Sequence, residues 1–193
     1  AAGHGGWPLL RFLYQWWRQP ARGEPAPSVR PDLNFLKGNR SVPTATWLGH
    51  ASYLIQLDGL NVITDPHLSP RASPLTATGP ARLQPPPIAH DDLPAIDVVL
   101  LSHNHYDHRD EATSRYLAAQ GTQFFVPLGV GQYFEDWGVP ADQVSEMEWW
   151  DSAEVGGLTI TALPSRHYSS RGVLDYKATH WSAWSIKSPS HAA

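Results

Sequence analysis

The chain has 193 residues, of which 41% are hydrophobic and 17% charged, and this balance favours a globular protein over a disordered one. Its formal net charge is −4 without a run of like charges, which argues against nucleic acid as the main partner, because phosphate binding needs a concentrated basic surface. The absence of cysteine excludes disulfides, thiolate metal sites and a cysteine nucleophile.

Residues 1–42 are predicted to form an N-terminal helix followed by a proline-rich linker. The stretch WPLLRFLYQWWRQP (residues 7–20) places leucines and tryptophans near one helical face, and the prolines from Pro20 to Pro31 end that helix. The aromatic segment at 7–18 either rests at a bilayer surface or packs on the domain's own core, and the second is favoured. No apolar run is as long as a membrane span. The sequence leaves the compartment open, with a cytoplasmic or membrane-peripheral location favoured.

The remaining chain alternates predicted strands and helices. Strands are predicted at 52–57 and 60–64 around an Asp58-Gly59 turn, at 96–102, 123–127, 144–150 and 180–187, and in a hairpin at 153–164 with Gly156-Gly157 at its turn. Helices are predicted at 110–121 and 131–138, and a long loop at 65–92. This mixed order predicts an α/β or α+β fold.

The stretch HNHYDH (residues 103–108) concentrates four metal-binding side chains at the end of a buried strand. His103 and His105 point the same way in extended backbone and can chelate one ion, whereas Asp107 and His108 come from the following turn and face a second ion. Nitrogen-rich ligands with a carboxylate and no sulfur favour zinc, with manganese, iron or cobalt as alternatives.

Three further residues are candidates because they lie at strand ends. His167 follows the strand LTITAL, and spacing alone leaves open whether it is a ligand or a buried histidine. His50 lies in LGHAS and Asp65 in ITDPH. Asp65 either orients a ligand histidine or caps the turn before Pro66. His4, His90 and His191 carry no such signal.

Several separated motifs resemble the metallo-β-lactamase superfamily. They are WLGHASYLIQLDGLNVITDPHLSPRASP, GPARLQPPP, LPAIDVVLLSHNHYDH, FFVPLG, WWDS and PSRHYSSRG, in this order, within about residues 43–186. They are most similar to the branch of N-acyl-phosphatidylethanolamine phospholipase D and its bacterial relatives, with the ascorbate-phosphate lactonases more distant. The resemblance implies an αββα sandwich, of which this chain supplies the first half and the start of the second.

The resemblance also implies a metal-dependent hydrolase. His103, His105 and His167 would hold the first zinc, and Asp107 and His108 would hold the second and form the catalytic centre, with His50 and Asp65 in support. A metal-bound hydroxide would attack the phosphorus of a small-molecule or lipid phosphodiester, as in phospholipase D-like cleavage of N-acyl phospholipids. A lactonase of the same superfamily is the alternative.

The chain departs from the family after its third histidine. Relatives continue to a GDTG-like turn whose aspartate bridges both metals, and then to a last histidine, whereas no GD dipeptide occurs here. Neither His180 nor His191 is expected to replace these ligands. Residues 43–193 are therefore expected to be an incomplete domain with exposed apolar surface and open strand edges. Either it is the N-terminal portion of a longer hydrolase, or it is a truncated remnant that binds at most one metal.

Overall fold

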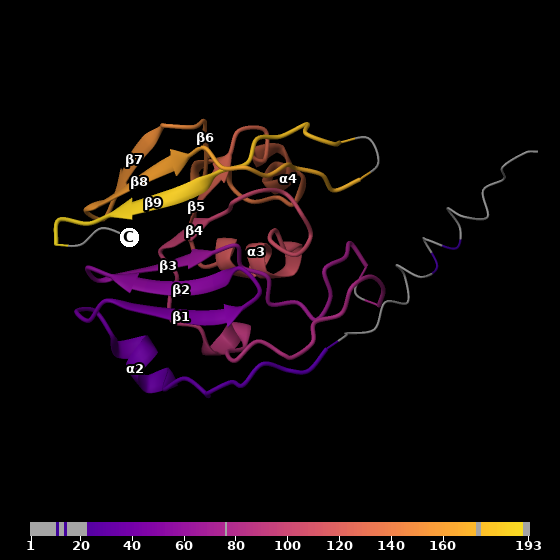
Figure 1. Ribbon diagram of the computed structural model, residues 1–193. Coiled ribbons are helices and arrows are strands. Elements are labelled where there is room, and N and C mark those ends of the chain that lie inside the picture. The colour runs from indigo at the N-terminus through magenta and orange to yellow at the C-terminus, as the bar shows by residue number, and fades with distance from the viewer. Residues whose placement is uncertain (1–10, 12–13, 15–22, 76, 173–174, 191–193) are drawn as a thin grey trace, which may run out of the picture.

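The computed structural model describes Arg11, Tyr14 and residues 23–75, 77–172 and 175–190 (Figure 1). Apart from Arg11 and Tyr14, the helix predicted at 7–18 lies outside these residues. Of the described helices, none combines the length and the hydropathy needed to cross a bilayer.

A six-stranded mixed sheet forms the centre of the fold. Its strands lie in chain order, β1 (Thr44–Gly49), β2 (Ser52–Leu57), β3 (Leu60–Thr64), β4 (Val98–Leu100), β5 (Gln123–Pro127) and β6 (Val144–Met147). The first three strands pair antiparallel through short turns, and β3 to β6 pair parallel. Since parallel strands need long crossovers, the loop at 65–97 and two helices fill these connections.

A second, three-stranded antiparallel sheet packs on one face of the first. It contains β7 (Ser152–Val155), β8 (Leu158–Leu163) and β9 (Ala183–Lys187). The predicted Gly156-Gly157 turn joins β7 to β8, and both glycines adopt positive φ angles of 52° and 89°. Figure 1 shows this sheet in orange and yellow above the purple strands β1 to β3.

Short helices cover the other face of the six-stranded sheet. They are α2 (Leu33–Gly38), α3 (Glu111–Ala118) and α4 (Gly131–Asp136), with single 3₁₀ turns at His90–Asp92 and Ala141–Gln143. Helix α2 was not anticipated by the sequence analysis. It begins where the Asp32 carboxylate accepts hydrogen bonds from the backbone N–H groups of Asn34 and Phe35, at 3.0 and 3.1 Å.

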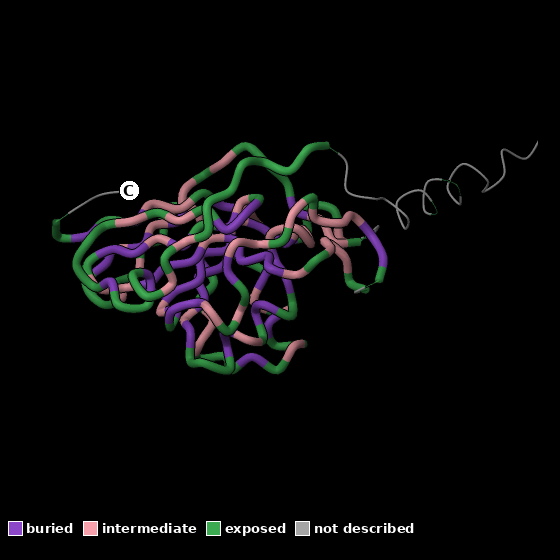
Figure 2. The backbone as a smooth tube through the Cα atoms, turned by 90° about the horizontal axis from the view of Figure 1, so that it is seen from below, coloured by how far each residue is buried: buried purple, intermediate pink, exposed green. Residues whose placement is uncertain are grey.

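Two hydrophobic cores follow from the alternation of side chains along the strands. In β4, Val98 and Leu100 point towards the second sheet, whereas Val99 and the following Leu101 point towards the helices. The layers are therefore helix, sheet, sheet. Figure 2 shows buried residues concentrated in the interior and exposed residues along the outer turns. This order confirms the predicted mixed α/β class and agrees with the helix, sheet and sheet layers of the predicted αββα sandwich.

Three predicted strands are shorter in the structure. The strand expected at 96–102 is Val98–Leu100, because the Ser102 N–H bonds to the Asp65 carboxylate and not to a neighbouring strand. The strand expected at 144–150 ends at Met147, where a turn closes between Glu148 and Asp151. The strand expected at 180–187 begins at Ala183, since the preceding chain bonds to loops of the first sheet instead.

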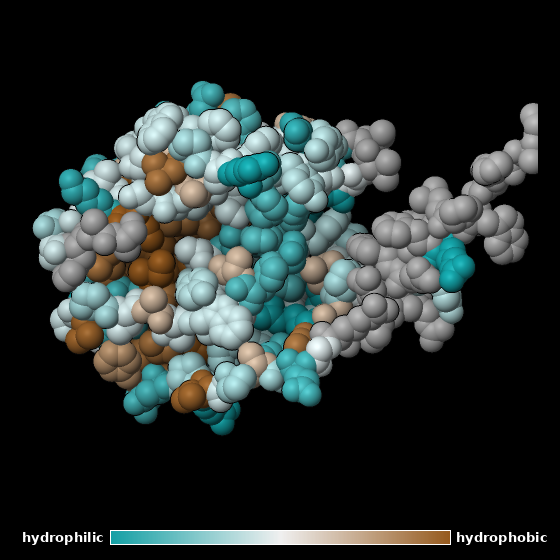
Figure 3. Space-filling model, viewed as in Figure 1, coloured by the Kyte–Doolittle hydropathy of each residue, from teal (hydrophilic) through white to brown (hydrophobic). Residues whose placement is uncertain are grey.

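The second sheet does not cover the whole face of the first. Apolar side chains gather between β9 and the strands β2 and β3 on the face shown in Figure 3. Ile55, Leu60 and Trp184 pack against the core between the two sheets but are only partly buried.

Candidate metal centre

The candidate residues converge because the strands that carry them end at the same place. Strands β3 and β4 are parallel neighbours, so Asp65 and the segment 102–108 leave the sheet at the same end, the carboxyl end of these strands. The turn between β1 and β2 brings His50 to this end of the sheet, and His167 follows β8 of the second sheet. The site therefore joins both sheets.

The first group of donors contains His103, His105 and His167. The His103 Nε2 atom lies 2.8 Å from His105 Nδ1 and 3.1 Å from His167 Nε2, so three ring nitrogens face one point. Three nitrogens around a tetrahedral zinc, each at ~2.05 Å from it, would lie about 3.3 Å apart. A single His103 nitrogen has one hydrogen or one lone pair, so it is not suited to satisfying two histidines at once. The arrangement fits a shared cation.

The second group contains Asp107, His108 and His50. The His50 Nε2 atom lies 3.0 Å from Asp107 Oδ2 and 3.3 Å from His108 Nε2, and the Asp107 and His108 atoms are 3.9 Å apart. The two groups are adjacent, because the rings of His103 and His108 have centroids 4.0 Å apart. Two nitrogens and a carboxylate oxygen are a donor set that zinc and related cations accept.

A buried carboxylate orients this pair of groups. The Asp65 Oδ2 atom lies 2.9 Å from His108 Nδ1, which leaves His108 Nε2 directed towards the second group. Asp65 also accepts hydrogen bonds from the backbone N–H and the hydroxyl of Ser102, at 2.6 and 2.7 Å. The Ser102 hydroxyl lies 2.8 Å from His103 Nδ1, so one aspartate reaches both groups.

The protonation equilibria of the donors differ with their surroundings. Burial, together with the neighbouring His108, His105 and His167, lowers the pKa of His103 to about 2, so its ring stays neutral. Burial alone would lower the pKa of His108, but the hydrogen bond and charge of Asp65 and the charge of Asp107 outweigh burial and raise it. Burial alone would raise the pKa of Asp107, but its hydrogen bond to His50 and the charge of His108 hold it well below the ordinary range.

The backbone around His50 is tightly constrained. Gly49 and His50 have positive φ angles of 105° and 47°, and a side chain at position 49 would overlap the Arg82 guanidinium. The Trp47 indole N–H donates to the His50 carbonyl at 2.9 Å. Arg82 donates to the carbonyls of Leu48 and His67, which ties the proline-rich loop to the turn carrying His50.

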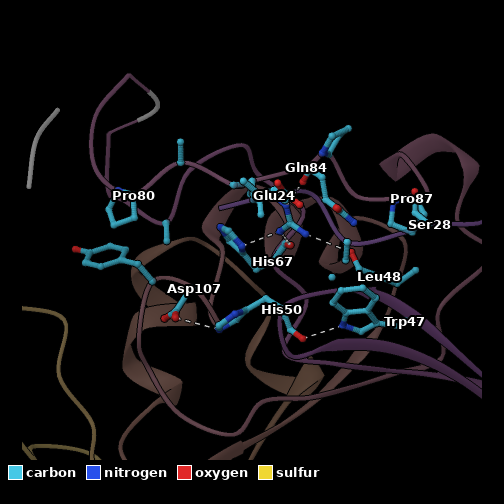
Figure 4. A pocket seen from close by; sticks show the side chains of 18 of the residues that line it. Glu24, Ser28, Trp47, Leu48, His50, His67, Pro80, Gln84, Pro87 and Asp107 are labelled. Atoms are coloured by element: carbon cyan, nitrogen blue, oxygen red, sulfur yellow. Dashed lines mark hydrogen bonds and ion pairs between the residues drawn. The ribbon is translucent and has the colours of Figure 1, made fainter. Parts of the chain in front are cut away.

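A cavity of about 740 Å³ opens beside both groups, and His50, His105 and Asp107 contribute to its wall (Figure 4). Apolar side chains form much of the remaining wall, among them Trp47, Leu48, Leu83, Pro85 and Pro87. The segment from Glu24 to Val29, which the sequence analysis assigned to a linker, closes one side. In Figure 4, His50 lies between Asp107 and Trp47, across the cavity from Pro80 and Gln84.

The structure brings together all seven residues selected from the sequence. His103, His105 and His167 form one group, and Asp107 and His108 lie in the other group together with His50. His50, expected in a supporting role, lies within donor distance of the second group, and Asp65 contacts His108 from behind. The other histidines within the described part of the chain lie outside both groups: His90 bonds to Thr113, His180 packs on Trp149, and His67 contacts Arg82.

Two residues that act on the site were missed by the sequence analysis. Ser102 links Asp65 to His103, and its position directly before HNHYDH was the available signal. Arg171 donates to the carbonyls of Asn104 and Arg109, at 3.1 and 2.8 Å, and so fixes the loop after His167 against the loop 103–109. No local sequence pattern indicates such a contact between distant loops.

Sequence comparisons place these observations among known proteins. The family described as the beta-lactamase superfamily domain matches residues 60–193. An uncharacterized protein of Mycobacterium tuberculosis is 42% identical over 91% of this chain and 47% of its own length. The N-acyl-phosphatidylethanolamine-hydrolyzing phospholipase D 1 of Caenorhabditis elegans is 40% identical over 74% of this chain and 42% of its own length. The chain thus spans less than half the length of these relatives.

Solved structures support the fold. The chain superposes on CmlA, a diiron β-hydroxylase from Streptomyces venezuelae, with a TM-score of 0.58 and 21% identity, over 78% of this chain and 28% of CmlA. It superposes on Igni18, a metallo hydrolase from Ignicoccus hospitalis, with a TM-score of 0.55 and 20% identity, over 78% and 57% of the two chains. At these identities the similarity concerns the fold alone.

Proposed function

We propose that this chain, which belongs to the β-lactamase superfamily, carries the metal centre of a hydrolase that cleaves phosphodiester bonds in amphipathic substrates. The observation that carries the proposal is the pair of adjacent donor groups in the wall of a 740 Å³ cavity. A cleft with a few convergent polar groups and a largely apolar remainder is typical of a site for a small molecule or lipid.

In this proposal His103, His105 and His167 hold one divalent cation, and Asp107 and His108 hold a second. Nitrogen and oxygen donors without sulfur favour zinc, and manganese or iron would accept the same atoms. Such cations, when bound, supply Lewis acidity towards a phosphoryl oxygen and lower the pKa of water. Asp65 and Ser102 hold the histidine rings in place, and the apolar walls exclude water around the reacting groups.

The cavity walls favour a substrate with both a charged and an apolar part. Next to the donor groups, Trp47, Leu83 and Val29 offer surface that suits an acyl chain better than a sugar or a nucleotide. The relatives named N-acyl-phosphatidylethanolamine-hydrolyzing phospholipase D support a phospholipase D-like reaction on N-acyl phospholipids. The phosphodiester would lie at the metals and the acyl chains along the apolar wall.

Hydrolysis assays with two phosphodiesters test this proposal. The zinc-loaded chain is incubated with an N-acyl phosphatidylethanolamine in mixed micelles and, separately, with bis(p-nitrophenyl) phosphate. We expect His103→Ala to abolish both activities, because it removes the nitrogen shared by the first group. We expect Leu83→Asn to reduce cleavage of the lipid about tenfold and to leave the small diester unaffected, because Leu83 contributes only apolar wall.

Three results would contradict the proposal in different ways. Hydrolysis of a simple lactone without hydrolysis of either diester would identify a lactonase. An equal effect of Leu83→Asn on both diesters would remove the lipid part of the proposal. Metal binding without any hydrolysis would identify a domain that holds the ions but does not catalyse the reaction by itself.

A further inference from the structure

Leu48, two positions before His50, is an extra residue in the pairing of β1 with β2. Trp47 and Gly49 lie opposite two consecutive residues of β2, so Leu48 between them forms a β-bulge. A bulge leaves backbone groups outside the ladder of the sheet, and such groups need another partner where they are buried. Leu48 is fully buried, so its carbonyl depends on a donor from elsewhere in the chain.

Arg82, in the proline-rich loop, supplies this donor. Its Nη2 atom donates to the Leu48 carbonyl at 3.2 Å and lies so close to Gly49 that a Cβ atom there would overlap it. Its Nε atom donates to the Gln84 carbonyl at 3.4 Å, and its Nη1 atom donates to the His67 carbonyl at 2.5 Å. Within the described part of the chain, none of the ion pairs involves Arg82, so its guanidinium binds backbone carbonyls and not a carboxylate.

His67 fixes this guanidinium relative to the sheet. His67 is 3% exposed, and its Nε2 atom lies 3.2 Å from the Arg71 carbonyl. Because a carbonyl only accepts, Nε2 carries the hydrogen, and Nδ1 is left to accept from Arg82 Nη1 at 3.0 Å. The backbone N–H of His67 donates in turn to the Ser52 hydroxyl of β2, at 3.1 Å. Arg82 is therefore held on a buried residue that is itself bonded to the strand paired with the bulge.

The bulge determines where the His50 ring lies. Gly49 and His50 follow it with positive φ angles of 105° and 47°, and a residue with a side chain seldom adopts such an angle. The Trp47 indole holds the His50 carbonyl at 2.9 Å. In this conformation His50 Nε2 lies 3.0 Å from Asp107 Oδ2 and 3.3 Å from His108 Nε2. Dashed lines in Figure 4 mark the contacts of His50 with Asp107 and with Trp47.

We propose that Arg82 is a positioning residue of the metal centre, which holds the bulge so that His50 becomes the third donor of the second group. This inference rests on the two cation sites of the function proposed above. Asp107 and His108 alone would give the second cation two protein donors, whereas zinc sites usually have three or four. A contact that orients a metal donor commonly changes the metal affinity about tenfold to a hundredfold. Arg82 therefore acts on the affinity of the second group without touching the ion.

Zinc titration of the full chain against a chromophoric chelator tests this role, because it gives a dissociation constant for each of the two cations. His50→Ala identifies the constant that belongs to the second group. We expect Arg82→Gln to weaken binding of that cation about tenfold and to leave the other constant unchanged, because the donors of the first group come from other elements. Arg71→Gln is the matched control, because Arg71 lies in the same loop but donates to the Gly79 carbonyl within it, at 2.6 Å.

A double-mutant cycle shows whether Arg82 acts through His50. If it does, Arg82→Gln has no further effect on the second cation once His50 is replaced with alanine. Circular dichroism checks that each variant folds. If Arg82→Gln does not fold, Arg82→Lys decides, and we expect it to weaken the same cation, because one ammonium cannot bind three carbonyls in the geometry of a guanidinium.

Other results would overturn the inference. Unchanged constants in Arg82→Gln, equal weakening of both cations, or the same weakening in Arg71→Gln would show that Arg82 does not position the second group. An undiminished effect of Arg82→Gln in the His50→Ala chain would exclude action through His50. Fewer than two zinc ions in the wild type would contradict the metal centre itself. The expected pattern without hydrolysis of either diester would remove the proposed function and leave the role of Arg82 in place.

Discussion

Asp65 illustrates how single residues build the metal centre. It follows β3, has a positive φ of 37°, and directs its carboxylate to His108 Nδ1 and to the backbone and hydroxyl of Ser102. Through these contacts one buried side chain sets the orientation of a ring in each donor group. A carboxylate behind a ligand histidine fixes its tautomer and raises its basicity, so Asp65 should control metal affinity without touching the ion.

Replacing this carboxylate with an amide tests its role. In Asp65→Asn the new amide NH₂ faces groups that themselves donate, namely His108 Nδ1 and the N–H and hydroxyl of Ser102, so it finds no acceptor there. We therefore expect the affinity of the second group for zinc to fall tenfold to a hundredfold. Competition with a chromophoric chelator measures this affinity. Asp97→Asn is the control, because Asp97 accepts a hydrogen bond from the Asn61 backbone, at the opposite end of β4. Equal zinc affinity in both variants would show that Asp65 is only structural.

At the scale of the elements, the loop after β8 determines where His167 lies. Asp175 organises this loop by accepting hydrogen bonds from the backbone of Arg171 and Gly172, at 2.7 and 2.6 Å, and from Tyr133 on α4. Burial alone would raise the pKa of Asp175, but these hydrogen bonds to the carboxylate outweigh it and lower the pKa. The ionised form is therefore the one that stabilises the loop.

The lowered pKa of Asp175 predicts how the stability that this loop contributes depends on pH. Because the pKa in the folded chain is lower than in the unfolded chain, the stabilisation is complete above about pH 4 and is lost as pH falls through the lowered pKa. We expect Asp175→Asn to lower the free energy of unfolding by about 1 kcal/mol at pH 7, and by less at pH 3. Urea unfolding at both pH values measures the difference. A difference that is the same at pH 7 and pH 3 would contradict this account.

Most elements of the fold could be predicted because their signals are local. The apolar run in β4, the Asp58-Gly59 turn between β2 and β3 and the apolar residues of β8 all agree with the structure. Helix α2 was missed because prolines dominate the preceding residues and only Asp32 signals its start. The start of β9 depends on hydrogen bonds from His180 and Ser182 to the distant residues Leu128 and Ser102, which no local pattern contains.

The candidate site also contains residues that local spacing predicts and residues that only long-range packing places. His103, His105, Asp107 and His108 were predicted from their spacing, because one strand end and one turn bring them together. His167 could not be assigned by spacing alone, since its position depends on how the second sheet packs on the first. The approach of His50 to Asp107 depends on two consecutive positive φ angles, at Gly49 and His50, and on the contact of Arg82 with Leu48.

On the scale of the whole molecule, the donor groups connect two sheets that are otherwise held together by packing and by hydrogen bonds such as the one from the Trp184 indole to the Leu101 carbonyl. His50 comes from the first turn of the six-stranded sheet, His103 from its centre, and His167 from the three-stranded sheet. The partly buried Ile55, Leu60 and Trp184 show that the contact between the two sheets is not closed on all sides. A cation at the first group would therefore link the two sheets.

This link predicts a metal-dependent gain in stability. A ligand that binds only the folded state at a thousand times its Kd adds about 4 kcal/mol, which raises Tm by roughly 10 °C for a chain of this size. We expect zinc to raise Tm in thermal unfolding followed by circular dichroism, and His167→Ala to remove most of the rise. His180→Ala is the control, because His180 lies in the same connection but outside both groups. A rise of the same size in both variants would contradict a link through His167.

The central claim is that the two donor groups hold two cations, and metal content per chain tests it most directly. The measurement is plasma mass spectrometry on the protein after zinc loading and gel filtration, with His103→Ala as the test variant and His90→Ala as the control. We predict two zinc ions per chain in the wild type and in His90→Ala, and at most one in His103→Ala. One ion or none in the well-dispersed wild-type chain, or an unchanged content in His103→Ala, would contradict the account.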